Sequence, residues 1–459
     1  MVDFGDKRLD RRFLTFRAAM VRQCSVILRK LAKDRSEEIG FGRFLRHPKV
    51  TSPKILGSNY WQTNQESRGK HVLLIQDTST LGFGLSPRAG KLGPIGDNKS
   101  RGIYLHPVLA LDAKQGTCLG LASTQFYQRK EYQEQEELSK FKARKAARRK
   151  RPFEQKESYR WWTSAKTAVQ NTAYANQHTV IADSESDIFD LMVNLEESNT
   201  DFILRNYHNR TLNFCRSGYQ LEDHLRKQKV QCSYEVDLPA TDERSAHLAQ
   251  LNVKWSSVNL TKPNDTPNKQ LPDTLSLTVV EVKEDANSVV NKEQPIHWRL
   301  LTSHKVKNKE QALQIIKWYT WRWVIEEFFR SLKKKGLNIQ SAQVESPESL
   351  TNLIAMSLNS SVEIMQLVQA RKGDNDLNMD LVFTEKEIQF IQHLNLKLEG
   401  RTKKLKNPHD TDSLAFAAWV VARLGGWSGY QSQRPPGPIT MANGLRRLRD
   451  AIFISNLDP

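Results

Sequence analysis

Residues 72–77, VLLIQD, form a short apolar run that ends in Asp77, and residues 179–183, TVIAD, repeat the arrangement with Asp183. Short apolar runs bounded by turn-forming residues are typical of buried β-strands. An acidic side chain at the end of a buried strand lies where the ligand sites of α/β sheets commonly open. Each aspartate alone is weak evidence, because aspartates at strand ends more often cap a turn or a helix, and the alternative for Asp183 is the N-cap of the following helix.

The segments around these two runs alternate between strand and helix patterns. Residues 103–111 and 119–124 are apolar and are separated by glycine-containing breaks, which predicts two strands beside the first. A helix is predicted over residues 154–175, followed after the second run by a helix over 188–195 and a strand over 202–204. This succession predicts an α/β fold class for the middle of the chain.

The flanking regions have different patterns. Residues 1–56 mix basic and apolar residues at helical spacing, which predicts a small, basic, all-helical domain. Between about residues 212 and 300 polar and apolar residues alternate, which predicts an antiparallel, half-exposed β-rich insertion. From residue 309 the pattern is mainly helical. We therefore expect a helical domain at 1–56, a core domain at 57–365 that carries the insertion, and a helical region at 366–459.

The composition indicates a polyanionic partner. Lys and Arg number 69 and Asp and Glu 51, which gives a formal net charge of +18 and a pI near 9.6. Nucleic acid is the first candidate, and the alternative is a basic protein that adheres to RNA or membranes nonspecifically. Four scattered cysteines form no CxxC pair, so neither a zinc knuckle nor a disulfide framework is indicated. The charged start and the brevity of the longest apolar stretch, residues 414–422, predict a cytosolic protein that does not enter a membrane.

A third acidic residue, Glu326, lies in a segment with a clear helical pattern. If residues 318–333 form one helix, its polar face carries one acid among a tyrosine and basic residues: Tyr319, Arg322, Glu326, Arg330 and Lys333. The adjacent apolar face suits burial against a sheet. Carboxylates are suitable ligands for Mg²⁺, and Arg and Lys neutralise phosphate oxygens, so the stripe favours phosphoryl transfer. The alternative is a solvated face on which Glu326 pairs with Arg322 or Arg330.

Four segments resemble the DDE transposases of the insertion-sequence-four family. They are QDTSTLG around Asp77, GDNKSRG at 96–102, ADSESDI around Asp183, and YTWRWVIEEFFRSLKK from Tyr319. The last contains the family's Tyr-Arg-Glu-Lys signature at its spacing, and the looser similarity extends from Gly5 to about Arg449.

The resemblance implies an RNase H-like catalytic core with a β-rich insertion, flanked by helical N- and C-terminal regions. It implies that Asp77, Asp183 and Glu326 bind two Mg²⁺ or Mn²⁺ ions. The activity implied is cut-and-paste DNA transposition: a nick at the transposon end, formation and opening of a hairpin, and strand transfer into target DNA. Its partners are double-stranded DNA, as transposon ends and target, and a second copy of the chain, in a bacterial cytosol.

Further residues take roles from the same resemblance. Phosphate contacts are expected from Tyr319, Arg322, Lys333, Arg205 and, on the polar stripe, Arg330. Trp298 matches a tryptophan that stacks on a flipped base, whereas without the resemblance it reads as a core residue of an alternating strand. Arg43 and Arg46 match the region that recognises transposon ends.

Two segments and the activity itself keep alternatives. The basic segment 140–151 either binds DNA through counterion release or is a solvated loop. Residues 444–453 have a spacing that suits either a partner contact or an intramolecular core helix. The rival functions are a catalytically inactive DNA-binding regulator derived from a transposase, which a shortened N-terminal region supports, and a simple metal-dependent nuclease that cleaves without joining.

Overall fold

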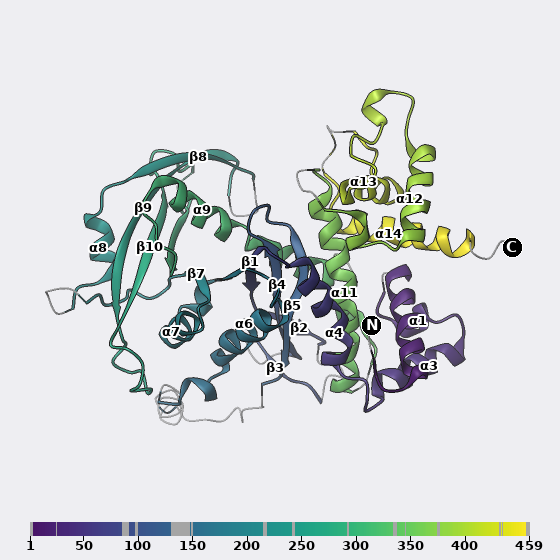
Figure 1. Ribbon diagram of the computed structural model, residues 1–459, viewed down its shortest axis with the longest axis horizontal. Helices are drawn as coiled ribbons and strands as arrows, with labels where there is room; N and C mark the ends of the chain where they lie inside the picture. Colours follow the sequence, from purple (N-terminus) through teal and green to yellow (C-terminus); the bar gives the residue numbers. More distant parts are fainter. Residues whose placement is uncertain are drawn as a thin grey trace.

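The computed structural model (Figure 1) describes the chain apart from a few segments. The residues that it does not describe are 1–2, 24, 85–90, 97–99, 130–146, 148–149, 214–217, 241–243, 292, 334–336, 345, 374–376, 431–432, 434 and 456–459. Most of the basic segment 140–151 and the centre of the GDNKSRG motif therefore lie outside the described residues.

One large β-sheet runs through the described chain. Its strands follow the order β2-β4-β1-β6-β7-β11-β10-β9-β8, and β3 and β5 also pair with β4. Strands β1, β6 and β7 are parallel to one another, and the other pairings are antiparallel. The strands are β1 His71–Gln76, β2 Ser79–Gly82, β3 Gly93–Ile95, β4 Ser100–Asp112, β5 Cys118–Tyr127, β6 Gln177–Ala182, β7 Asp201–Arg205, β8 Cys232–Leu238, β9 His247–Thr261, β10 Thr274–Glu284 and β11 His297–Thr302.

Helices cover the sheet and form both ends of the chain. Those before and within the α/β part are α1 Lys7–Gln23, α2 Leu28–Leu31, α3 Arg35–Arg46, α4 Ser52–Glu66, α6 Arg160–Asn171, α7 Phe189–Glu197 and α8 Leu221–Lys227. The later ones are α9 Lys309–Thr320, α10 Trp323–Leu332, α11 Pro347–Ala370, α12 Glu385–Leu398, α13 Leu414–Leu424 and α14 Pro438–Ser455. None of the helices in the described part of the chain is long and apolar enough to cross a membrane.

Strand β1 is buried on both faces, which explains its uninterrupted apolar sequence. Val72 and Leu74 point into one hydrophobic cluster with residues of α6 and α7. Leu73 and Ile75 point into a second cluster, on the opposite face, with residues of α4, α10 and α11. The strands predicted at 72–75, 103–111, 119–124 and 202–204 are all present in the sheet.

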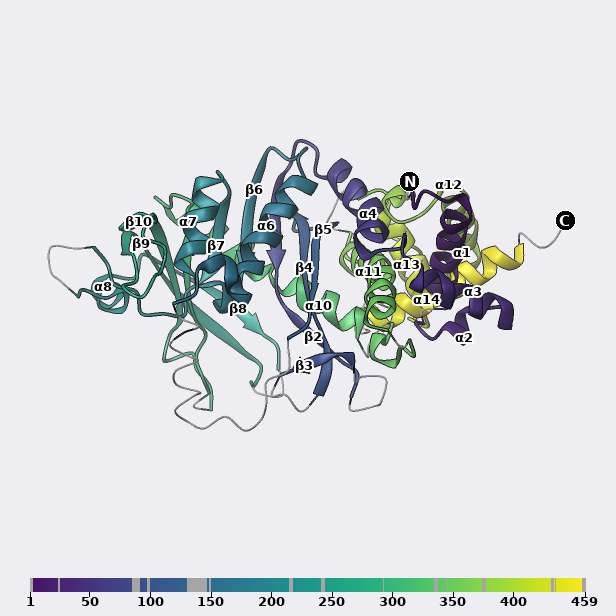
Figure 2. The ribbon, with the colours of Figure 1, turned by 90° about the horizontal axis from the view of Figure 1, so that it is seen from below.

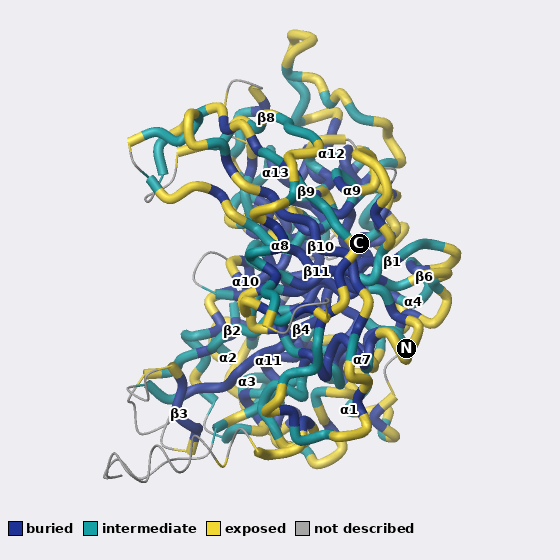
Figure 3. Tube along the Cα trace, turned by 90° about the vertical axis from the view of Figure 1, so that its left-hand side faces the viewer, coloured by how far each residue is buried: buried dark blue, intermediate teal, exposed yellow. Residues whose placement is uncertain are grey.

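The β-rich insertion continues the same sheet. Strands β8 to β11 are antiparallel neighbours, as predicted, and β11 joins them to the core by pairing with β7. Figures 1 and 2 both place this extension at one end of the molecule and helices α1, α3 and α12 to α14 at the other. In Figure 3 the buried stretches run through the sheet and α11.

Two helices cross the expected domain boundaries. Helix α4 spans residue 56 and α11 spans residue 365, and the hydrophobic cluster around Leu73 also includes residues of α1, α3 and α11. The division at 56 and 365 stays a prediction. Residues 444–453 lie in α14, where Leu445 and Leu448 are buried in the C-terminal core, which favours the intramolecular alternative for this segment. A homodimer also stays a prediction.

The helix predicted over 154–175 is shorter than expected. Two 3₁₀ turns, Phe153–Gln155 and Glu157–Tyr159, come first, and α6 begins only at Arg160. The reason is local, because Lys156 between the turns has an extended backbone with ψ 146° and breaks the helical run.

Candidate active site

The topology brings Asp77 and Asp183 to one edge of the sheet. Asp77 follows β1 and Asp183 follows β6, and these parallel neighbours pair Ile75 with Ile181. Each aspartate lies two residues beyond that pair, where the carboxyl ends of parallel strands open. Asp183 also caps the turn that follows, because its Oδ1 accepts the Glu185 N–H at 3.0 Å, so the capping alternative is realised as well.

Glu326 approaches the same edge on α10, and Arg322 links it to Asp77. Nη1 of Arg322 lies 3.2 Å from Oδ2 of Asp77 and 3.5 Å from Oε1 of Glu326. The alternative pairing of Glu326 with Arg322 therefore exists in the structure, whereas Arg330 pairs with Glu327. The two acids share one guanidinium, so they are close neighbours.

The charges of Asp183 and Glu326 act on Asp77. The pKa of Asp77 is raised to about 7, mainly by burial and then by the charge of Asp183, with a smaller contribution from Glu326. The Thr78 N–H and the charge of Arg322 oppose the shift. Burial opposes the charge on Arg322, but Tyr319 and the three acids raise its pKa. A buried carboxyl whose pKa lies near neutrality beside other acids marks a candidate functional site.

The carboxylates of Asp77, Asp183 and Glu326 are suitable ligands for a divalent cation, although Arg322 neutralises two of them here. Within the described residues no three His, Cys, Asp or Glu side chains are arranged to hold a metal ion. Two carboxylates contact the Arg322 guanidinium, and the charge of a third, Asp183, acts on both Asp77 and Arg322. Such a group of carboxylates, one of them with its pKa raised to about 7, is the kind of ligand set that hard cations such as Mg²⁺ prefer. The residues present therefore suit the metal even though their side chains are arranged around an arginine.

The polar stripe predicted on one helix is divided between two helices. Helix α9 ends at Thr320 and α10 begins at Trp323, so the prediction of a single helix over residues 318–333 is wrong. Backbone bonds from Val324 to Trp321 and from Ile325 to Arg322 make a tight turn between them. Such i→i+3 bonds keep nearly helical periodicity, which is why the sequence pattern runs through the break.

The remaining stripe residues surround the acids. Tyr319 is buried, and its ring packs edge-on against Trp298 with centroids 5.5 Å apart. Lys333 donates from Nζ to Ser79 Oγ at 2.7 Å, and burial lowers its pKa. Lys333, Glu326 and Arg330 line a hollow of about 690 Å³ that runs along β2. Of the three acids, Glu326 is the one that lines this hollow.

The predicted contacts on the insertion side lie near Tyr319, and those on the N-terminal side lie elsewhere. Arg205 ends β7 beside β11, which carries Trp298, and Arg205 is close enough to affect the pKa of Tyr319. Trp298 is half-buried, so its exposure is intermediate between that of a core residue and that of an exposed platform for a base. Arg43 and Arg46 are exposed on α3, which packs on α11 rather than on β1 or β6.

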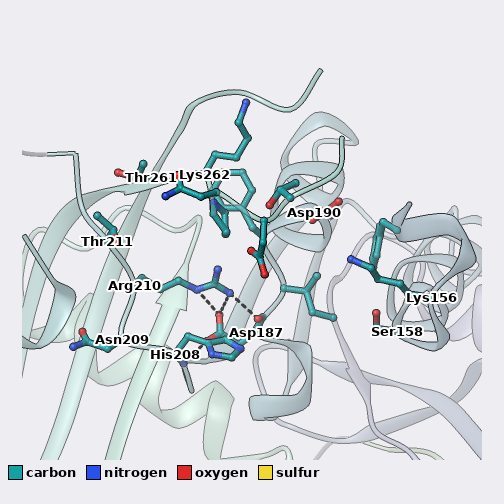
Figure 4. Close-up of a pocket in the computed structure, with 17 residues that line it drawn as sticks. Lys156, Ser158, Asp187, Asp190, His208, Asn209, Arg210, Thr211, Thr261 and Lys262 are labelled. Atoms are coloured by element: carbon teal, nitrogen blue, oxygen red, sulfur yellow. Dashed lines mark hydrogen bonds and ion pairs between the residues drawn. The ribbon is translucent and has the colours of Figure 1, made fainter. Parts of the chain in front are cut away.

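A buried ion pair that the sequence did not reveal holds the loop after Arg205. Asp187 is completely buried and pairs with Arg210, with Nη2 and Oδ1 2.5 Å apart. Its Oδ2 accepts the N–H groups of Tyr207 and His208, each at 2.8 Å. Figure 4 shows this pair at the edge of a pocket of about 500 Å³ that Lys156 also lines. Asp187 lies inside the quoted ADSESDI motif, but nothing local identifies its partner.

Comparison with known proteins gives the family. The model of the transposase DDE domain family matches residues 122–360, more than half of the chain, and this range includes Asp183 and Glu326. Among solved structures, a cryo-EM structure of the piggyBac transposase synaptic complex with hairpin DNA is similar at 10% identity, covering 99% of this chain and 73% of that one. Its TM-score of 0.36 is too low to support an argument. On the family match, the chain belongs to the transposase DDE domain family.

Proposed function

We propose that this protein is a cut-and-paste DNA transposase whose active site is formed by Asp77, Asp183 and Glu326. The single observation that carries the proposal is the gathering of the three acids around Arg322: Asp77 and Glu326 contact its guanidinium, and the charge of Asp183 helps to raise its pKa. The family match supports transposase chemistry, and the net charge of +18 supports DNA as the partner.

An RNase H-like core is part of the proposal. Strand order β5-β4-β1-β6-β7, in which only β1, β6 and β7 are parallel, supports it. In this arrangement the first acid follows the central strand, the second follows its parallel neighbour, and the third comes from a later helix. We further propose that the protein acts as a homodimer on DNA in a bacterial cytosol.

Asp77, Asp183 and Glu326 would hold two divalent cations, Mg²⁺ or Mn²⁺. When bound, these ions supply activation of the attacking water or 3′-hydroxyl and stabilisation of the departing 3′ oxygen. In the metal-free protein Arg322 contacts Asp77 and opposes the rise in its pKa, so the guanidinium occupies the place where a cation would neutralise this carboxylate.

The neighbouring residues would bind and orient DNA. Arg322 would contact a phosphate once a cation takes its place on the carboxylates. Lys333 and Arg330 line the same hollow as Glu326. We propose Arg205 and Tyr319 as further phosphate contacts and Trp298 as the platform for a flipped base. One site serves the nick, the hairpin, its opening and strand transfer, because each is a displacement at phosphorus.

A DNA-cleavage assay with a matched variant tests the proposal. Purified protein is incubated with labelled DNA fragments from the two flanks of its own gene, with Mg²⁺ or EDTA. The variants are Glu326→Gln and, as control, Glu327→Gln, the next residue on α10, which pairs with Arg330. We expect hairpin and joined products from the wild type and the control only.

Other outcomes would identify the rivals. Metal-dependent cleavage without joined products would favour a nuclease. Tight binding to the flanks with no metal-dependent product would favour the regulator, for which the neutralisation of Asp77 and Glu326 by Arg322 is the specific observation.

A further inference from the structure

The two aspartates at the sheet edge are held by their turns in the same way. Oδ1 of Asp77 accepts the backbone N–H of Thr78 at 2.6 Å. Oδ1 of Asp183 accepts the backbone N–H of Glu185 at 3.0 Å. The orientation of each carboxylate therefore depends on where its turn lies.

One side chain from a different element contacts both turns. Arg160, the first residue of α6, donates from Nε to Thr78 Oγ1 at 3.1 Å and from Nη2 to Glu185 Oε2 at 3.3 Å. Its Nη1 donates to the backbone carbonyl of Glu157 at 3.0 Å. The Arg160 side chain is only 12% exposed, so its guanidinium is engaged with protein on every side. A planar, rigid fork of this kind fixes the distance between the groups that it bridges.

The Thr78 end of this bridge is fixed from behind. Thr78 Oγ1 lies 2.8 Å from Nδ1 of His106, and His106 Nε2 lies 3.1 Å from Oε1 of Gln76. Because arginine only donates, the Thr78 hydroxyl accepts from Arg160 and donates to Nδ1, which leaves the Nε2–H for Gln76. His106 is fully buried and packs edge-on against Trp161, with ring centroids 4.7 Å apart. The Thr78 rotamer therefore has little freedom.

We infer that Arg160 is a positioning residue that sets the spacing between Asp77 and Asp183 by bridging their turns. The inference rests on the proposed function, because spacing matters only if the two carboxylates bind the same cations. Groups behind metal ligands orient them, and losing such a group costs roughly 10–100-fold in metal affinity. Mg²⁺ tolerates little departure from its preferred geometry, so a slackened pair of turns is expected to weaken cation binding.

The alternative role for Arg160 is a direct phosphate contact. Its low exposure and its three occupied nitrogen atoms argue against that role, since contact with DNA would require it to leave both turns. The two roles differ in what the arginine affects, metal affinity or DNA affinity.

The test measures Mn²⁺ binding to the full chain without DNA. Metal-free wild type and Arg160→Gln are titrated with Mn²⁺, and free Mn²⁺ is followed by electron paramagnetic resonance. The matched control is Arg129→Gln. Arg129 donates to the carboxylate of Glu157, whose backbone carbonyl also accepts from Arg160, and the described hydrogen bonds of the Arg129 side chain go to Glu157 rather than to Thr78 or Glu185. We expect about a tenfold or greater rise in the Mn²⁺ Kd for Arg160→Gln and less than a twofold change for the control.

A second variant guards against a folding defect. Thr78→Val keeps the shape of the side chain but removes its bonds to Arg160 and His106, and it should weaken Mn²⁺ binding in the same direction. DNA affinity in EDTA should stay as in the wild type for all variants. Unchanged Mn²⁺ affinity in folded Arg160→Gln would overturn the inference, and so would a loss confined to DNA affinity. A wild type that binds no Mn²⁺ would instead overturn the proposed function.

Discussion

Replacing Asp77 by asparagine should make the metal-free protein more stable. Burial and the charges of Asp183 and Glu326 raise the pKa of Asp77 from 3.8 to about 7, even with Arg322 and the Thr78 N–H opposing them. At about 1.4 kcal/mol for each pKa unit, keeping this carboxylate ionised in the folded state costs up to about 4 kcal/mol above neutral pH. Asparagine removes the charge and keeps an oxygen that accepts the Thr78 N–H.

The sign of the pH dependence follows from the direction of the shift. Between about pH 4 and 7 folded Asp77 binds a proton more tightly than the unfolded chain does, so wild-type stability is lost as the pH rises through this window. The advantage of Asp77→Asn should therefore grow by about 2–3 kcal/mol between about pH 5 and 8. Buried histidines with lowered pKa values, such as His106, act in the opposite direction but cancel in the difference between the two proteins.

Urea unfolding in EDTA at several pH values measures this difference. Glu327→Gln is the control, because Glu327 lies on α10 beside Glu326 but pairs with Arg330 outside the cluster. Its stability difference from the wild type should depend little on pH. If the Asp77→Asn difference is equally flat, or if the variant is less stable throughout, the convergence of buried charge on Asp77 is refuted.

Three further predictions concern neighbouring parts of the site. Adding Mn²⁺ at about a hundred times its Kd should raise the wild-type unfolding free energy by about 2.7 kcal/mol, and equal stabilisation of Glu326→Gln in a calorimetric scan would exclude Glu326 as a ligand. Asp187→Ala should lower the free energy of unfolding in urea by about 3–5 kcal/mol, because it leaves Arg210 buried without its partner. A loss below about 1 kcal/mol would contradict the ion pair of Asp187 with Arg210 as a main support of the loop after Arg205. Trp298→Ala should slow hairpin formation while nicking continues, and time courses in which both steps slow equally would return Trp298 to a packing role beside Tyr319.

The sequence predicted the parts of the site that depend on local pattern. Apolar runs ending in Asp77 and Asp183 became neighbouring parallel strands, and the edge they share follows from parallel pairing. The position of Glu326 on a helix was also correct, although that helix is interrupted before it at Trp321 and Arg322. At this break both residues keep backbone angles of the helical region and the bonds are i→i+3, so the periodicity changes little and no spacing pattern reveals it.

The residues that hold the acids in place were not predictable, because their partners are distant in sequence. Arg160 contacts Thr78, Asp187 contacts Arg210, and His106 reaches Gln76 from the neighbouring strand β4. Each of these side chains has an ordinary local context, such as the start of a helix or the middle of a strand. Their importance lies in geometry that exists only after the sheet has formed.

The same geometry explains how three converging acids are tolerated in a folded chain. Ionised carboxylates in a desolvated position destabilise the native state unless a positive charge accompanies them. Arg322 supplies that charge from the turn between α9 and α10, where a small change in backbone direction would move it relative to Asp77 and Glu326. A metal cation that binds the carboxylates neutralises them in place of Arg322. The guanidinium then lies beside the metal-bound site with no acidic partner. Metal binding and recruitment of a DNA phosphate by Arg322 should therefore be positively coupled, so that Asp77→Asn with Glu326→Gln raises DNA affinity in EDTA while abolishing its dependence on Mn²⁺.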